Sequence, residues 1–323
     1  MTKAEENPEY KEFIIKQNKK NFLRCFWPGG RCMEKAIRAH SIQNSRVLAS
    51  IAERGDVIML RAKQDFDSGP KVRFESIGKN NATTFTGLCQ KHDDILFKPI
   101  EKAAIDLSSE EHLFLLAYRA ILRELHSKMK AAIDFGSIYE KGCKDGKFDP
   151  RIHDVASQSL TMKIAESYSC YRYKFSFDVL YRKKLFDQVS HAKLSVKSDK
   201  PIIAVSSVYD VFNNMRFYQD RMDPKVIALN ILPLNEYTHI IFSFRKDHEE
   251  TLRPSLAPIL SATGHYQLYL ISKLVLRHCE NFVISPGHFR TFSPEKIEAM
   301  TRYFSKNMFA RKEDYDDENL YLF

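Results

Sequence analysis

Hydrophobic residues recur at intervals of three and four along the stretch that follows residue 107, which is the period of a helix with one buried face. A Ser-x-x-Glu pattern from Ser108 to Glu111 predicts the capped start of this helix. The apolar positions continue to about residue 133. A second helical stretch, at about 153–189, follows Pro150, and the short linker predicts that it returns antiparallel to the first.

The pattern changes to short runs of β-branched and aromatic residues after Pro201, which predicts strands. We expect strands at 202–208, 226–231 and 239–244, with residues 233–236 in a hairpin turn. Two helices should follow, at about 264–279 and 294–306, the second with Ser293 as N-cap and Pro294 at its first position. Before residue 105, the pattern predicts a short strand or turn within 35–43, a helix at 47–52, and strands at 56–61 and 71–76 around a turn at 67–70.

The order of these elements predicts an α+β protein with two units. The first, residues 1–105, is rich in Cys, His, Gly and Asn and is expected to be a small metal-stabilised module. The second, residues 106–323, is expected to be a helix-rich domain with a small antiparallel sheet. A length of 323 residues with 44% hydrophobic residues suits two folded units.

Several classes of protein are disfavoured by the distribution of apolar residues and cysteines. The longest apolar runs, 113–118 and 239–244, are much shorter than the ~18 residues that a membrane-spanning helix needs. The N-terminus is polar and lacks the apolar core of a secretory signal, so we expect a cytoplasmic protein. In that compartment the six cysteines are expected to be thiols, with Cys143, Cys170 and Cys279 as small buried side chains.

The net charge of +9 makes nucleic acid a candidate partner, because a basic surface attracts polyanions. The stretch 311–319 departs from this balance, since it is acidic. We expect it to be frayed, and we expect no structural role for the last six residues.

Two pairs of metal-ligating residues predict a structural zinc site. Cys89 and His92 have the Cys-x-x-His spacing that lets one turn or helix start present two donors to one ion. Cys25 and Cys32 are more widely spaced, but Trp-Pro-Gly-Gly between them favours a turn that closes the loop. The alternative is that the three cysteines are ordinary buried thiols and His92 is a surface residue.

These residues resemble a treble-clef zinc finger and, more loosely, nucleases of the HNH superfamily, and the same pattern resembles uncharacterised bacterial proteins. The nuclease resemblance implies that His40 deprotonates the attacking water, that Asn81 holds the His40 ring, and that Asp93 binds a catalytic Mg²⁺. The chain departs from this family at Ala39, where the nucleases carry a metal ligand. The alternatives are that the catalytic metal is held in another way, that the finger binds without cutting, and that His40 is structural or replaces Cys25 as a zinc ligand.

Basic and aromatic residues interleave between residues 163 and 200. We predict that the cations contact nucleic acid, and the residues assigned to this role are Arg172, Lys174, Arg182, Lys183 and Lys184. The aromatic residues are better explained as the core face of a long helix. The charges fit equally well with a solvated helix face.

Arg119 and His126 lie seven residues apart on the first long helix and resemble the Arg and His pair of HEPN-type ribonucleases. An ordinary helix surface explains them better, because the polar residue after Arg is missing. Two hypotheses follow for the whole chain. In the first, the zinc module and the basic helix engage nucleic acid; in the second, the finger is purely structural and the C-terminal domain binds a protein or a small molecule.

Overall fold

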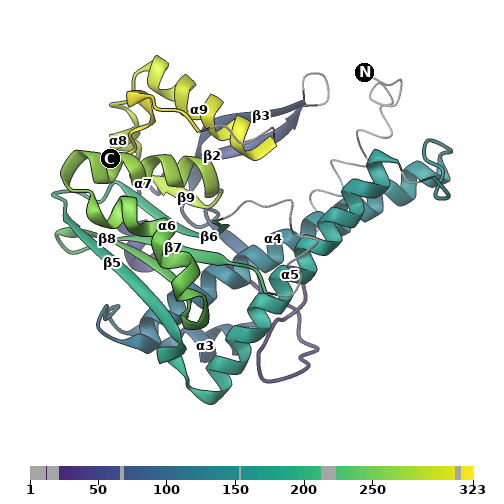
Figure 1. Ribbon diagram of the computed structural model, residues 1–323, viewed down its shortest axis with the longest axis horizontal. Coiled ribbons are helices and arrows are strands. Elements are labelled where there is room, and N and C mark those ends of the chain that lie inside the picture. Colours follow the sequence, from purple (N-terminus) through teal and green to yellow (C-terminus); the bar gives the residue numbers. More distant parts are fainter. Residues whose placement is uncertain (1–11, 13–21, 66–68, 153, 212–222, 310–313) are drawn as a thin grey trace.

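The computed structural model describes residue 12 and residues 22–65, 69–152, 154–211, 223–309 and 314–323 of the chain (Figure 1). Within these ranges the protein is a mixture of helices and antiparallel sheet, as the α+β prediction required. The sheet is larger than expected, since it contains seven strands in the order β3-β2-β9-β6-β7-β8-β5.

All strand pairs of this sheet are antiparallel. The short strand β9 is the third in this order and joins β2 to β6 through Ile284, which is paired with both Ile58 and Ile203. The strands are β2 (Asp56–Asp65), β3 (Gly69–Gly78), β5 (Val189–Lys197), β6 (Ile203–Asp210), β7 (Val226–Leu234), β8 (Tyr237–Arg245) and β9 (Phe282–Ile284).

Both faces of the sheet are apolar, because successive side chains of its central strands point alternately into two buried clusters. On β8, Ile240 and Phe242 belong to one cluster and Ile241 belongs to the other. A helical layer covers each face. Helices α6 (Glu249–Ser261), α7 (Gly264–His278) and α9 (Pro294–Phe309) lie on one side, and α3 (Gln90–Lys102), α4 (Glu110–Lys144) and α5 (Val155–Lys183) lie on the other (Figure 1).

Helices α4 and α5 form a long antiparallel hairpin. Its distal half extends well beyond the sheet (Figure 1). The N-cap lies one residue later than predicted, because Ser109 rather than Ser108 accepts the hydrogen bond from the His112 backbone N–H, and Glu111 is therefore not at the N3 position of a capping box. Ser108 bonds Asp106 instead. The helix also continues to Lys144, well beyond the predicted end at residue 133.

The N-terminal part of the chain contains a second, two-stranded sheet, β1 (Arg38–His40) with β4 (Thr84–Thr86). Helix α3 follows β4 directly, and the segment between the two strands carries α2 (Ala49–Ile51) and the β2–β3 hairpin. The predicted boundary at residue 105 separates segments that share the seven-stranded sheet and one buried cluster.

The elements of the C-terminal two thirds that were not predicted include β5, α6, β9 and the short helix α8 (Pro286–Phe289). The second long helix ends at Lys183 instead of about residue 189, and β5 begins at Val189. Pro233 lies inside β7 rather than in the turn, which is made at Asn235 with a left-handed φ of 56°. Part of the predicted turn at 67–70, residues 67 and 68, lies outside the described residues, and Gly69 and Pro70 belong to β3.

The C-terminal segment is ordered against the protein, so the expectation of fraying was wrong for residues 314–319, and the last six residues have the structural role that was not expected of them. Leu320 and Leu322 are completely buried between α7 and α9. The Leu322 backbone N–H donates to Ser272 Oγ at 2.9 Å, and Asp314 pairs with Arg277 at 2.8 Å. Apolar anchors and ion pairs therefore hold this acidic segment in place.

None of the helices in the described ranges is both long enough and apolar enough to cross a membrane.

Candidate metal centre

The four predicted metal ligands come from two segments that are far apart in the sequence. Cys25 and Cys32 flank the turn at residues 27–30, and an isolated bridge between Arg24 and Lys35 closes this segment, which we call the knuckle (residues 22–36). Cys89 is the N-cap residue of α3, and His92 lies in its first turn. The backbone of Phe26 bonds the carbonyl of Gly87, which holds the knuckle beside the start of α3.

The ligand atoms of these residues all lie within 4.8 Å of one another. His92 Nδ1 is 3.4 Å from Cys25 Sγ and 3.2 Å from Cys89 Sγ, and Cys32 Sγ is 4.0 Å from Cys89 Sγ. A tetrahedral zinc site with metal–sulfur bonds of ~2.3 Å and metal–nitrogen bonds of ~2.0 Å has ligand atoms about 3.5–3.8 Å apart. The donor set therefore fits a metal ion without rearrangement of the backbone.

The electrostatics of the group also fit a bound cation. Burial raises the pKa of Cys25 to about 11, because the thiolate loses hydration there. Cys25 and Cys89 are almost completely buried, and Cys32 and His92 are half-buried. Thiols need a nearby positive charge to ionise in such surroundings, and a divalent ion supplies it.

The knuckle is fixed to helix α5 by two contacts. Lys174 Nζ donates to the Phe26 carbonyl oxygen at 2.6 Å, and Trp27 packs edge-on against Tyr181 with ring centroids 6.2 Å apart. Trp27 also stacks on the His92 ring at 4.3 Å, with an angle of 6° between the planes. Trp27 therefore lies between a candidate metal ligand, His92, and helix α5.

The predicted catalytic residues His40, Asn81 and Asp93 lie on β1, in the turn before β4 and in the first turn of α3. His40, at the end of β1, has Nδ1 3.0 Å from the carbonyl oxygen of Ala82. The expected partner of that ring, Asn81, instead accepts a hydrogen bond from Arg38 at 3.3 Å. Asp93 is half-buried in the first turn of α3, and burial raises its pKa. His40 is not one of the four clustered metal ligands.

The predicted nucleic-acid-binding residues all lie on α5 or at its C-terminal end, but they differ in exposure. Arg182, Lys183 and Lys184 are exposed at this end, and Arg172 is half-exposed. Lys174 was predicted wrongly as a surface cation, because its side chain is buried between Phe26 and Asp178. Burial lowers the pKa of Lys174 and raises the pKa of Asp178, and the 2.7 Å ion pair opposes both shifts.

The aromatic residues of α5 divide between two faces, so their assignment to the core was only partly correct. Tyr173 and Phe177 are buried, Phe177 against Phe114 of α4 and Tyr173 against Phe177 and the Val226 carbonyl of β7. Tyr168, Tyr171 and Phe175 remain 56%, 47% and 50% exposed. The spacing of three and four within each set was a signal in the sequence that two different faces carry aromatic rings.

Arg119 and His126 are both buried, which disagrees with a ribonuclease pair open to substrate and also shows that the preferred interpretation as an ordinary helix surface was wrong. Arg119 pairs with Glu101 at 2.6 Å and lies over the Phe97 ring. His126 Nε2 is 2.8 Å from Thr86 Oγ1, and burial lowers the pKa of His126 to about 4. Both residues join α4 to the N-terminal segment.

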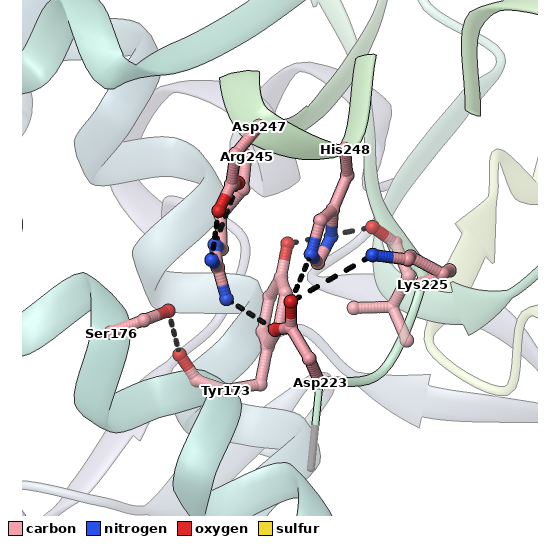
Figure 2. A network of polar contacts seen from close by, with 8 residues as sticks. Tyr173, Ser176, Asp223, Lys225, Arg245, Asp247 and His248 are labelled. Carbon is pink, nitrogen blue, oxygen red and sulfur yellow. Dashed lines mark hydrogen bonds and ion pairs between the residues drawn. The ribbon is translucent and has the colours of Figure 1, made fainter. Parts of the chain in front are cut away.

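A second polar cluster, which the sequence did not suggest, lies where β8 ends (Figure 2). Asp223, Asp247 and His248 have ligand atoms close enough to hold a metal ion. The Arg245 guanidinium, however, pairs with both carboxylates, and His248 Nε2 is 2.6 Å from Asp223. Because a cation already compensates the two acids, this cluster is a structural network rather than a metal site.

Comparisons of the chain with protein families, curated proteins and solved structures found no match.

Proposed function

We propose that this protein binds nucleic acid and that a structural zinc ion stabilises the part of it that does so. The observation that carries the proposal is the contact between the Cys3His group and the basic end of α5, made by Phe26 and Trp27 of the knuckle with Lys174 and Tyr181. Through this contact, a metal ion at the group would fix the position of an exposed cationic surface.

The donor set supports zinc as the metal. Three thiols and one imidazole are soft or borderline ligands, which suit zinc better than magnesium or calcium. Four protein ligands complete a tetrahedron and leave no position for water or substrate, as in structural zinc sites. The ion would join the knuckle to the first turn of α3.

The cations near the group support a polyanionic partner. Arg182, Lys183 and Lys184 are exposed at the end of α5, and the knuckle adds the exposed side chains of Arg24, Arg31 and Lys35. The only acid in the knuckle is Glu34. Phosphate groups of nucleic acid would release counterions from such a surface, which gives affinity that depends strongly on salt.

Fluorescence anisotropy with labelled DNA and RNA at about 50 and 200 mM salt tests this proposal. We expect binding at low salt that weakens steeply at high salt. The variant R182Q/K183Q/K184Q should bind more weakly and lower the slope of log affinity against log salt by about 2–3. A matched control, R61Q/K200Q/R302Q, removes three exposed cations from other elements and should change the slope by less than about 1. Absence of binding to either polymer at the lower salt concentration would overturn the proposal.

A second candidate function is hydrolysis of a phosphodiester with His40 as general base. The contact between His40 Nδ1 and the Ala82 carbonyl favours it, because only a protonated Nδ1 can donate to a carbonyl. This fixes the tautomer in which Nε2 carries the lone pair. Burial lowers the pKa of His40, which keeps the ring neutral near pH 7.

This second function ranks lower because few side chains near His40 are available to bind a catalytic metal ion. The residue before His40 is Ala39, and the nearby Glu101 is already paired with Arg119. If the function is correct, H40A should abolish Mg²⁺-dependent cleavage and leave the zinc content unchanged. An equal cleavage rate in H40A and the parent would exclude it.

A further inference from the structure

One face of helix α5 carries three aromatic side chains that the fold leaves about half exposed, at Tyr168, Tyr171 and Phe175. Positions three and four apart lie on the same side of a helix, so these rings form one continuous stripe. The buried rings of the same helix, Tyr173 and Phe177, belong to the core, where Phe177 stacks with Phe114 and Tyr118 of α4 and Tyr173 packs against Phe177. The exposed stripe is therefore separate from the core of the hairpin.

The charge beside this stripe is positive. Arg172 lies four residues after Tyr168, and Arg182 lies seven residues after Phe175, which places both on the same face. The two acids of α5 are both compensated within the hairpin: Glu166 pairs with Lys128 and Lys163, and Asp178 is buried against Lys174. The face thus combines flat apolar rings with cations, and the acids of its own helix do not oppose an anionic ligand.

The spacing of the rings distinguishes between nucleic-acid ligands. A rise of ~1.5 Å per residue separates the three rings by about 4.5 and 6 Å along the helix axis. Bases in a duplex are stacked at ~3.4 Å and paired with each other, so they do not offer their faces to protein side chains. The bases of a single strand can be spread apart and stacked individually on aromatic rings.

We infer that the face formed by Tyr168, Tyr171, Arg172, Phe175 and Arg182 is a binding site for single-stranded nucleic acid. Bases stack on the three rings, and the two guanidinium groups contact the phosphates. The inference rests on the proposed function and adds to it the class of ligand and a contact that does not depend on charge. A second copy of the chain fits this face less well, because it would present the same cations.

Anisotropy measurements on the full-length, metal-loaded protein test the inference, with an oligo-dT or oligo-U of about 12 nucleotides and a mixed-sequence duplex of equal length as probes. The variant Y168A/Y171A/F175A should weaken single-strand binding by at least ~100-fold, since each stacked base contributes substantially to affinity. Its salt slope should equal that of the parent, because no cation is removed. Duplex binding, which depends on the cations alone, should change by less than about 3-fold.

The variant Y168F/Y171F, which keeps both rings and loses only the hydroxyl groups, should bind like the parent. Thermal unfolding of every variant verifies that these exposed positions have been changed without loss of the fold. Single-strand affinity that is unchanged in the triple alanine variant would overturn the inference and leave the proposed function standing. A dimer in the parent that becomes monomeric in this variant would assign the face to self-association instead. Failure of the parent to bind any probe at low salt would refute the proposed function and the inference together.

Discussion

The side-chain nitrogen of Lys174 lies 2.6 Å from the carbonyl oxygen of Phe26, so a cation of the basic helix α5 is buried where that helix meets the metal-binding knuckle. Asp178 lies 2.7 Å from the same nitrogen and also accepts a hydrogen bond from Tyr118. Lys174 is thus shared between the knuckle, α4 and α5. The Lys174 side chain connects these elements inside the protein, so a ligand cannot reach it from the solvent.

Replacement of this lysine should therefore reduce stability strongly. We expect K174M to lower the free energy of unfolding by about 3–5 kcal/mol, because Asp178 is left as a buried charge without its partner. The double variant K174M/D178N should recover part of the loss, since the uncompensated charge is gone and the amide oxygen introduced by D178N can still accept a hydrogen bond from Tyr118. K183M, at an exposed position of the same helix, should change stability by less than about 0.5 kcal/mol. Urea denaturation measures all three, and equal losses for the single and the double variant would argue against charge burial as the cause.

The purified protein should contain about one zinc ion per chain. The only tryptophan of the chain, Trp27, stacks on His92, so its fluorescence should report the state of the group. We expect a strong chelator to change the emission of Trp27 at the same rate as zinc is released.

C89S should lose the metal and unfold the N-terminal segment, because binding energy at a structural site is folding energy. C143S, which lies on α4 away from the group, should retain it. Metal-free protein with unaltered stability and emission would contradict this prediction.

The buried histidine His126 should make stability depend on pH. Burial lowers the pKa of His126 to about 4, against about 6.5 in the unfolded chain. Between these values the unfolded state binds more protons, so stability is complete above about pH 6.5 and falls as the pH is lowered toward about 4. The shift corresponds to a loss on the order of 3 kcal/mol. In H126Q the side-chain amide can still donate to Thr86. The free energy of unfolding of H126Q relative to that of the parent should therefore rise as the pH falls from about 6.5 to about 4. A difference independent of pH would show that His126 does not titrate on unfolding.

The C-terminal segment should contribute directly to stability. Leu322 is completely buried, and its backbone bonds Ser272 and His288. L322A should lower the free energy of unfolding by about 2–5 kcal/mol, as is usual for a leucine in a close-packed core. E318A, at an exposed position four residues earlier, serves as the control and should have little effect. Equal midpoints of urea unfolding for L322A and the parent would contradict the packing described above.

Local patterns predicted most of the elements because they depend on residues that are near each other in the sequence. The period of three and four placed α4, α7 and α9, and runs of β-branched residues placed β2, β3, β6, β7 and β8. The missed elements are short or lack a clear period. Strand β9 has only three residues, and its position between β2 and β6 depends on partners that are distant in the sequence. Helix α6 contains Pro254 and Pro258, which usually argue against a helix.

The ligand set Cys25, Cys32, Cys89 and His92 was predicted from spacing, and the structure brings all four together. Residue type and spacing suffice here because a metal ion accepts few donors in few geometries. The exposure of the α5 side chains could not be predicted in the same way. Lys174 and Lys183 look alike in the sequence, and only the docking of the knuckle on one side of α5 buries the first and exposes the second.

The sequence by itself determined the periodic elements, the basic charge and the four candidate metal ligands, because each depends on local spacing or on composition. The tertiary structure decided three further properties: that β2 and β3 join the seven-stranded sheet, that the acidic C-terminal segment is anchored, and that three aromatic rings of α5 remain outside the core. All three follow from which surfaces meet when distant segments pack together. Apolar burial is not directional and selects partners by shape and by the area removed from water, so these partners become visible only in the folded chain.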